Sequence, residues 1–532
     1  MSSPVIVQGE IVNTNAQTAA QPNVTTPEYS KTLEYGGDIP EVSKGELQPR
    51  KFNDPVWAFL FLAQVVVIAV LAGVNGPKVA ETMMGGRRLT DSNMIYSDSS
   101  NNHNDMNSVS RILTTMIAST SNSFSSSTNT ERELNEDEYE VDPAHVINVV
   151  VCSSIIGFIF SGLSLTFMMS FAELLIKAGL YFNIFSGIFL AIVGLMLPDV
   201  FTALLGFMFA AFAAYYAYSV WNRIPFAAAN LVTAVSAVKE NIGVTLYAYI
   251  SIVFMILWMT LWTFSTSATI FVISNCNAAG ECQNEVNGFV VFLFLVSLFW
   301  TFEVIKNIVH VTVSGTVGTW WWQPESASSC CSSAVRDSFF RSITYSFGSI
   351  CLGSLLVAII KALKQMVHRA RESDDGILRC LAECILGCIE SILEYFNEWA
   401  YVYVALYGYS FVDAAKNVIN LFQERGWTTI ITDGMIGTVL TMISLGVGIL
   451  TGIFAVMISS ILQYNLEVPA FFLGFILGAF LTSLLMGVVG SAVNTVIVCY
   501  AEDPKAFETY HSDLSYRMRD AWRQAWPAEF KY

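Results

Sequence analysis

Ten stretches of this chain are apolar enough to lie in a lipid bilayer. A helix needs about 18 to 20 apolar residues to span ~30 Å of hydrocarbon. The sequence therefore predicts an all-α, polytopic membrane protein with about ten transmembrane helices. The clearest stretches are 56–74, 146–169, 178–197, 200–221, 242–270, 288–308, 343–360, 434–459 and 470–498, and 399–411 is a weaker tenth.

The charge and motif content excludes several functional classes. Charged residues make up 13% of the chain, whereas ~25% is usual for soluble domains. The net charge of −16 comes mostly from acidic residues in the tails and the first long loop. We find no P-loop, Rossmann glycine fingerprint, basic arm or metal-ligand spacing. We therefore expect no ATP motor, no enzymatic activity, no cofactor, no metal and no nucleic-acid partner.

The apolar stretches divide the chain into three parts. Residues 1–52 are polar and lack a cleavable signal peptide, so we expect a disordered cytosolic tail. Residues 53–499 form the predicted transmembrane domain. Within it, 75–145 is a long external loop, expected to be flexible because it is rich in Ser, Asn and Thr. Residues 500–532 form a second predicted cytosolic tail.

The positions of basic residues conflict with a simple alternation of spans in one region. Lys and Arg in short loops mark the cytosolic side, and the first half of the chain obeys this rule. After 343–360, alternation places the chain outside, yet five basic residues follow. Either the rule fails in this region, or the segment 288–322 crosses the membrane twice. Because of the basic residues, we predict that 361–379 is cytosolic. The basic residues are Lys361, Lys364, Arg369, Arg371 and Arg379.

Two segments have the pattern of amphipathic helices that lie along a membrane surface. In 223–239 apolar residues recur near helical spacing, and Pro225 suits a first turn. The segment 378–399 is the second. Cys276 and Cys282 lie in the predicted external connection after 242–270. Because that side is oxidising, we predict a disulfide between them.

Short motifs follow one another in a fixed order along the second half of the chain. The series begins with Trp300-Thr301-Phe302-Glu303 and ends with Glu502-Asp503-Pro504; between them lie 310–321, 345–355, 400–401, 407–408, 411–417 and 493–500. Together these motifs resemble the choline transporter-like family of solute carriers, its fungal and protist branch more closely than its animal one. The resemblance extends from Phe52 to about Pro504.

The resemblance implies ten spans, both termini in the cytosol and a large first external loop. Characterised animal members carry choline, and some carry ethanolamine or other cations. In those members the first external loop carries glycans and cysteines. Residues 75–145 contain neither a glycosylation sequon nor a cysteine, so this chain departs from that part of the pattern.

Aromatic residues at membrane depth are candidates for binding a cation. A quaternary ammonium makes no strong hydrogen bonds, so a protein holds it with aromatic faces, and a carboxylate adds attraction. The alternative is that these residues belong to the interfacial belts of Trp and Tyr common to membrane proteins. The candidates are Trp258, Trp262, Trp300, Tyr401, Tyr403 and Tyr407.

Glu303 is the best single candidate for a substrate-binding residue. It lies within the apolar stretch 288–308, where an uncompensated carboxylate costs at least ~2.5 kcal/mol. Trp300 and Lys306 are each one helical turn away. Glu303 either attracts a visiting cation or forms an internal pair with Lys306 that only stabilises packing, and the sequence leaves both readings open.

These features predict a carrier for a small organic cation, and choline is the first candidate substrate. We expect the protein to lie in the plasma membrane, in contact with membrane lipids. The alternative is a channel, or a lipid-organising membrane protein without transport.

Overall fold

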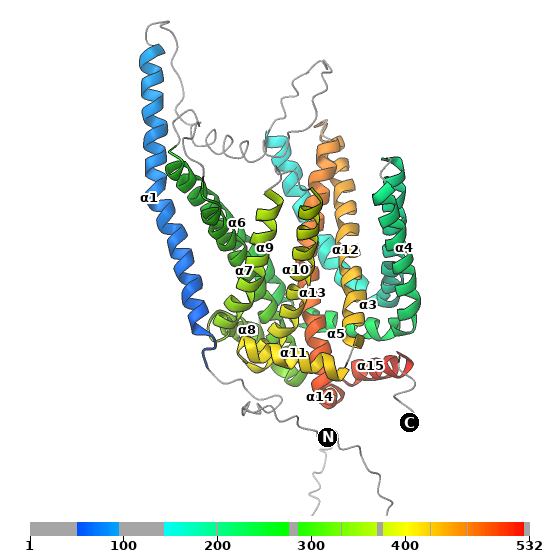
Figure 1. The fold of residues 1–532 in the computed structure, drawn as a ribbon. Helices are drawn as coiled ribbons and strands as arrows, with labels where there is room; N and C mark the ends of the chain where they lie inside the picture. The colour runs from blue at the N-terminus through cyan, green and yellow to red at the C-terminus, as the bar shows by residue number, and fades with distance from the viewer. Residues whose placement is uncertain are drawn as a thin grey trace, which may run out of the picture. The chain divides into compact units, whose positions relative to one another are not determined.

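The structure is a computed structural model that describes residues 51–94, 143–197, 200–275, 286–330, 332–369, 376–425, 427–464 and 467–525. Within these ranges all regular structure is helical, as the sequence predicts (Figure 1). The expected N-terminal tail up to residue 50 lies outside the described residues. So do Cys276 and Cys282, and their disulfide stays a prediction.

The long helices stand side by side, and several short ones lie across one end of them (Figure 1). In chain order they are α1 (Pro55–Met94), α3 (Pro143–Met196), α4 (Val200–Val220), α5 (Ile224–Glu240), α6 (Gly243–Ile273), α7 (Gly288–Trp322), α8 (Ser333–Ile343), α9 (Phe347–Arg369), α10 (Gly376–Tyr407), α11 (Phe411–Arg425), α12 (Trp427–Ile461), α13 (Glu467–Glu502), α14 (Pro504–Tyr510) and α15 (Ser512–Ala525).

We call the end at which α11, α14 and α15 lie the α15 end, and the opposite one the far end (Figure 1). At the α15 end the carboxylate of Asp54 accepts hydrogen bonds from Ser349 Oγ (2.6 Å) and from the backbone N–H of Phe411 (2.9 Å). The starts of α1, α9 and α11 therefore meet there.

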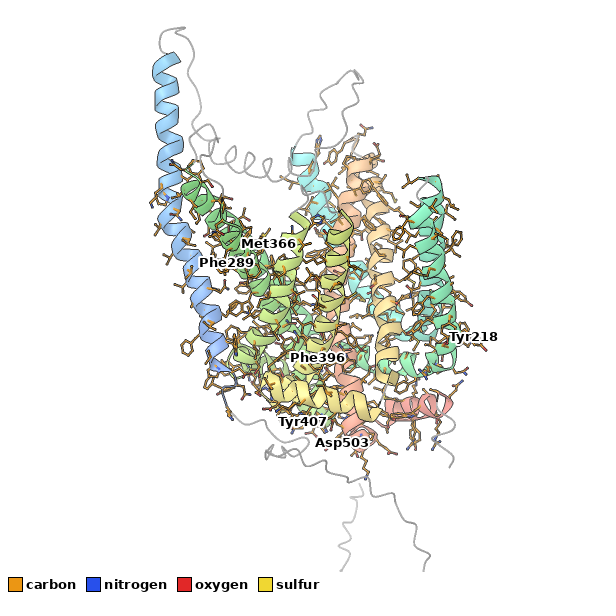
Figure 2. All side chains as sticks on the ribbon, in the orientation of Figure 1. Tyr218, Phe289, Met366, Phe396, Tyr407 and Asp503 are labelled. Carbon is orange, nitrogen blue, oxygen red and sulfur yellow. The ribbon has the colours of Figure 1, made fainter. Side chains whose placement is uncertain are left out.

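At the far end, α7 begins where α9 finishes. A Cβ atom on Gly288 would lie 3.6 Å from Met366 Cε. Figure 2 shows Phe289 and Met366 near each other and well away from Tyr407 and Asp503, which lie at the α15 end. α7 and α9 are thus antiparallel, and α10 returns from the far end to the α15 end.

α3 crosses between the two ends twice. Its first turn lies at the far end, where the ring of His145 stacks on that of Tyr464 (centroids 4.0 Å apart), just after α12. Its last turn is also at the far end, where Gly194 packs against the backbone of Ala203 near the start of α4. Phe171, midway, has non-helical backbone angles (φ −128°, ψ 29°). The two limbs are the predicted spans 146–169 and 178–197.

Eight helices in the described part of the chain are long and apolar enough to cross a membrane. α3 runs between the two ends twice, and α10, which is not among the eight, also runs between them, so ten helical segments of the described chain connect the two ends. α10 corrects the sequence prediction, which placed a surface helix at 378–399 and a weak span at 399–411. The first segment and residues 399–407 of the second belong to one continuous helix packed against α7, α9 and α13, and Phe411 already begins α11. α10 looks amphipathic because its acidic face meets α9 rather than water.

The basic residues predict that 361–379 is cytosolic, on the same side as both termini. Residues 361–369 do not fit that arrangement, because they lie in the part of α9 toward the far end, whereas the start of α1 lies at the α15 end. Which end is cytosolic stays a prediction. α9 begins at the α15 end and finishes at Arg369 at the far end, so simple alternation holds. The physical reason is that the positive-inside rule counts basic residues in loops. Lys361 and Lys364 instead lie within the span and are paired with acidic residues, Lys364 with Glu390 at 2.7 Å.

The predicted surface helix at 223–239 is present as α5, with Pro225 in its first turn. However, it is largely buried, and Leu231, Ala234 and Val235 are fully inaccessible. α3, α13 and α15 pack against it. α15 covers the helix, and the ring of Trp522 lies edge-on to Phe226 with centroids 5.6 Å apart.

α1 extends further than the sequence predicts. It continues to Met94, so residues 75–94 of the expected external loop are helical. Asn75 Nδ2 donates to Thr269 Oγ1 (3.0 Å), and Gly76 packs against the ring of Phe264. These contacts hold this part of α1 against α6. The rest of that loop, up to residue 142, lies outside the described residues.

Glycines allow two helix pairs to approach closely, as expected where small residues line an interface in a membrane. A Cβ atom on Gly474 of α13 would lie 2.6 Å from the Cβ of Ala455 on α12. Between α3 and α4, Gly194 and Gly206 pack directly against the backbone of the other helix.

Gly194→Leu is expected to reduce sharply the yield of folded protein, because its side chain would overlap the backbone at Ala203 and overpacking costs ~1–3 kcal/mol or more. Size-exclusion chromatography and thermal unfolding of the detergent-purified protein measure this. Gly162→Leu on the same helix is the control, since a Cβ there meets no atom within 4 Å. Equal yields and midpoints for the two variants would contradict the prediction.

Candidate functional site

The candidate site is built around one polar face of α7. A helix pairs its backbone N–H and C=O groups internally, which is required in hydrocarbon, and the mostly apolar sequence of α7 is therefore helical throughout. α7 contacts α6, α8, α9, α10 and α13. Glu303, Asn307 and His310 lie at i, i+4 and i+7, which places them on one face. Their exposed fractions are 6%, 4% and 7%.

Glu303 is paired with a lysine of another helix. Lys361 Nζ of α9 lies 2.5 Å from Glu303 Oε1 and 2.6 Å from Glu394 Oε1 of α10. The sequence left open a pair between Glu303 and Lys306; the structure instead places Lys361 at this carboxylate. One ammonium group thus joins α7, α9 and α10.

The same interface continues toward the far end as a ladder of charged and polar contacts between α9 and α10. Lys364 Nζ lies 2.7 Å from Glu390 Oε2. His368 Nδ1 lies 3.4 Å from Glu383 Oε1. The acidic face of α10 is therefore matched to the basic face of α9, with Glu303 at the inner end of the ladder.

A cavity of about 980 Å³ lies beside Glu303, between α6, α7, α10, α12 and α13. Much of its wall is apolar, and three aromatic rings, Phe302, Tyr395 and Phe480, contribute to it. The polar residues of the wall are Ser251, Glu303, Lys306, Asn307, His310, Glu398, Thr441, Ser444, Ser483, Ser491 and Asn494.

Acidic groups outnumber basic groups at this wall. Glu303, Glu398 and Lys306 line the cavity, and Glu394 and Lys361 are joined to Glu303 directly. Glu398 interacts electrostatically with Lys306, Glu394 and Glu303. Three carboxyl groups thus lie at or next to this wall, together with two lysine side chains.

His310 joins α7 to two other helices at the cavity wall. Its Nε2 lies 2.9 Å from the backbone carbonyl oxygen of Glu398, and its Nδ1 lies 2.7 Å from Ser491 Oγ. A carbonyl oxygen only accepts, so Nε2 carries a proton. In the neutral ring, Nδ1 then accepts from the hydroxyl of Ser491.

The structure places Trp300 in a helix contact rather than on the cavity wall. Its Nε1 donates to the carbonyl oxygen of Cys351 on α9 (2.9 Å). The ring of Phe61 lies edge-on to it, with centroids 5.4 Å apart. Both the polar edge and the face of Trp300 are thus used to pack α1, α7 and α9 together.

Trp258 and Trp262 also lie away from the cavity, on α6. Trp258 is 7% exposed and packs in a cluster with Ile68, Phe294 and Leu298. Trp262 Nε1 donates to the carbonyl oxygen of Phe294 (3.0 Å). The two indoles face α1 and α7, and their predicted role in substrate binding gains no support from this position.

The three tyrosines of α10 lie near the α15 end. Tyr401 is fully buried, and its hydroxyl donates to the carbonyl oxygen of Ile350 (3.1 Å). The Tyr403 hydroxyl donates to Glu502 Oε1 (3.1 Å). Tyr407 is 7% exposed and stacks on Tyr409. The structure therefore brings only Glu303, of the predicted binding residues, to the cavity wall.

Comparison with known proteins agrees with this architecture. Protein PNS1 of Debaryomyces hansenii is 29% identical over 378 residues, 68% of this chain and 74% of that protein. Protein PNS1 of Kluyveromyces lactis is 29% identical over 408 residues, 72% of this chain and 73% of that protein. A CTL-like protein of Dictyostelium discoideum is 33% identical over 288 residues, 53% of this chain and half of that protein.

The family described as plasma-membrane choline transporter matches residues 204–505, more than half of the chain, from α4 to the start of α14. The matched region contains the whole candidate site. Fungal and Dictyostelium relatives are those expected of the predicted branch. The chain belongs to the choline transporter-like family.

Proposed function

We propose that the protein carries choline, or a closely related small organic cation, through the cavity between α6, α7, α10, α12 and α13. The observation that carries the proposal is the buried carboxyl group of Glu303 at the wall, with Glu398 beside it on the wall and Glu394 joined to it through Lys361. An ionised carboxyl group there attracts a cation. The family description supports this class of substrate, and the cavity has the size of small-molecule sites, about 300–1,000 Å³.

The lining suits a methylated ammonium better than a strongly hydrated metal ion. Its methyl groups need apolar and aromatic contacts, which the cavity offers through Phe302, Tyr395 and Phe480. Away from water the attraction between opposite charges strengthens, so the carboxylate of Glu303 favours entry of the cation over neutral molecules of similar size.

In this mechanism Lys361 is a tethered cation that occupies Glu303 and Glu394 when no substrate is bound. An arriving ammonium competes with it for the same carboxylates. Lys361 belongs to α9, whereas the carboxylates belong to α7 and α10. When the substrate replaces Lys361 at these carboxylates, the contact of α9 with α7 and α10 becomes weaker. This couples substrate binding to movement between helices, as alternating access requires.

Uptake of labelled choline, ethanolamine and thiamine into vesicles that contain the purified protein tests the proposal. We expect saturable uptake of choline that unlabelled choline inside the vesicles accelerates. Flux that rises linearly with concentration would instead indicate a channel. Absence of uptake for every organic cation would refute the carrier function.

We also propose that the protein lies in the plasma membrane with its α15 end and both termini in the cytosol. The family description supports the membrane. Lys177 follows the bend of α3 at Phe171, and Arg223 and Lys239 lie at the two ends of α5. Basic residues at this end favour the cytosolic side.

This orientation predicts that a cysteine introduced at Ser373, in the connection between α9 and α10, reacts with an impermeant maleimide on intact cells. A cysteine introduced at Ser512, the first residue of α15, should react only after permeabilisation. Labelling is measured above that of the unmodified protein. The reverse pattern at the two sites would contradict the orientation.

A further inference from the structure

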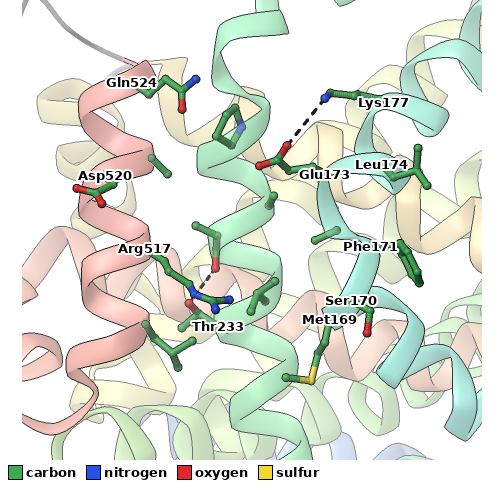
Figure 3. Close-up of a pocket in the computed structure, with 17 residues that line it drawn as sticks. Met169, Ser170, Phe171, Glu173, Leu174, Lys177, Thr233, Arg517, Asp520 and Gln524 are labelled. Atoms are coloured by element: carbon green, nitrogen blue, oxygen red, sulfur yellow. Dashed lines mark hydrogen bonds and ion pairs between the residues drawn. The ribbon is translucent and has the colours of Figure 1, made fainter.

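A second pocket, of about 680 Å³, lies at the α15 end between α3, α5 and α15 (Figure 3). It is separate from the cavity beside Glu303 and shares no lining residue with it. α3 reverses direction here at Phe171, where its backbone leaves the helical conformation. The bend opens space between the start of the second limb and the C-terminal helix.

Charges of both signs face this pocket from opposite sides. Glu173 and Lys177 come from α3, and Arg517 and Asp520 come from α15. Figure 3 shows Arg517 extending from α15 toward α5, with Thr233 beside it. The two carboxylates and two basic groups on the wall balance each other, so a ligand that also carries both charges fits the pocket.

The acidic residues of the pocket are held only loosely by protein partners. Lys177 Nζ lies 3.9 Å from Glu173 Oε2, and the two side chains are 41% and 59% exposed. Asp520 Oδ1 lies 3.9 Å from Arg523 Nη1, which is outside the pocket wall. Exposed pairs at this distance contribute little to stability, so a ligand can replace them.

The apolar part of the wall indicates a ligand with a hydrocarbon portion. Ala228, Ala229 and Val232 of α5 line the pocket. On the side away from α15, Phe171 and Leu174 are 48% and 60% exposed (Figure 3). Because both side chains are apolar and exposed, they offer contacts for the acyl chains of a lipid whose headgroup occupies the pocket.

We propose that this pocket binds the headgroup of a zwitterionic phospholipid. Arg517 and Lys177 hold the phosphate, since guanidinium and ammonium groups make strong charge-assisted hydrogen bonds to its oxygens. Glu173 and Asp520 hold the headgroup ammonium, and the acyl chains leave past Phe171 and Leu174. The lipid thereby ties α15 to the bend of α3.

Native mass spectrometry of the purified, delipidated protein tests this after addition of phosphatidylcholine, phosphatidylethanolamine or phosphatidylglycerol. We expect retention of one zwitterionic lipid. Arg517→Gln should weaken that retention about tenfold, the value of one charge-assisted contact. Arg519→Gln is the control, because Arg519 pairs with Glu508 (3.0 Å) away from the pocket and should leave retention unchanged.

Three results would overturn the proposal: unchanged retention by Arg517→Gln, preference for phosphatidylglycerol, or displacement of the lipid by millimolar glycerophosphocholine. The last would assign the pocket to a soluble phosphate ester. If Arg517→Gln does not fold, Lys177→Gln takes its place, with the same expected loss. None of these outcomes depends on choline transport, because the readout is bound lipid.

Discussion

Replacing Glu303 by Gln is expected to lower choline uptake at least tenfold while the protein still folds and inserts. Gln has nearly the same shape and still accepts a hydrogen bond from Lys361, so the contact between α7 and α9 remains. The change removes one carboxylate from the cavity wall. A contact to a charged group is worth ~1.5–3 kcal/mol, a factor of about 10 or more in affinity.

Glu390→Gln is the matched control. Glu390 pairs with Lys364 in the same ladder but is not on the cavity wall, so this variant should keep most of its uptake. Km and maximal rate are measured for both variants in vesicles at equal protein content. Wild-type kinetics in Glu303→Gln would mean that Glu303 is structural and that the cation binds elsewhere.

The sequence was informative about Glu303 because of the energetic cost of a carboxylate in hydrocarbon. That cost predicts burial, which the structure confirms. It does not predict the partner. Lys361 is 58 residues away, and its basic neighbours suggested a cytosolic loop. Only the antiparallel packing of α7 and α9 reveals that lysine and carboxylate meet within the membrane-spanning region.

The fold was predictable wherever the apolar stretches were continuous. The two limbs of α3 and the spans α12 and α13 follow directly from hydropathy. α10 did not, because acidic residues interrupt its apolar sequence, and three of them, Glu383, Glu390 and Glu394, contact α9. A helix whose charges are satisfied by another helix has the same sequence pattern as one that lies on a membrane surface, and single-sequence hydropathy does not separate them.

The aromatic residues show the limit of reading chemistry from residue type. The sequence singled out Trp258, Trp300 and Tyr401, and each contacts other helices through its ring and remains outside the cavity wall. A better signal was present in the spacing of Glu303, Asn307 and His310. Three polar residues on one face of an apolar helix predict a polar interior, whether or not aromatic residues are nearby.

Lys361→Met is expected to tighten choline binding about tenfold and to slow transport. The lysine occupies two carboxylates, Glu303 and Glu394. Without it, both are left without their ammonium partner, and breaking a buried pair in this way costs ~3–5 kcal/mol. A bound organic cation recovers part of that energy, so the thermal stabilisation that saturating choline gives should be larger in the variant than in the wild type. Release of the cation becomes correspondingly unfavourable, which lowers the maximal rate.

Two further variants separate competition by Lys361 from a loss of structure. Lys364→Met removes the neighbouring lysine, which pairs only with Glu390 in the described structure, and should leave choline affinity unchanged. Lys361→Met combined with Glu394→Gln removes one basic and one acidic group, so the balance of acidic and basic groups near the cavity is that of the wild type. That double variant should fold, bind choline more tightly than the wild type and recover turnover relative to Lys361→Met alone. If Lys361→Met and the double variant both bind choline with wild-type affinity, Lys361 does not compete with the substrate, and its pairing with Glu303 serves only to hold α7 and α9 together.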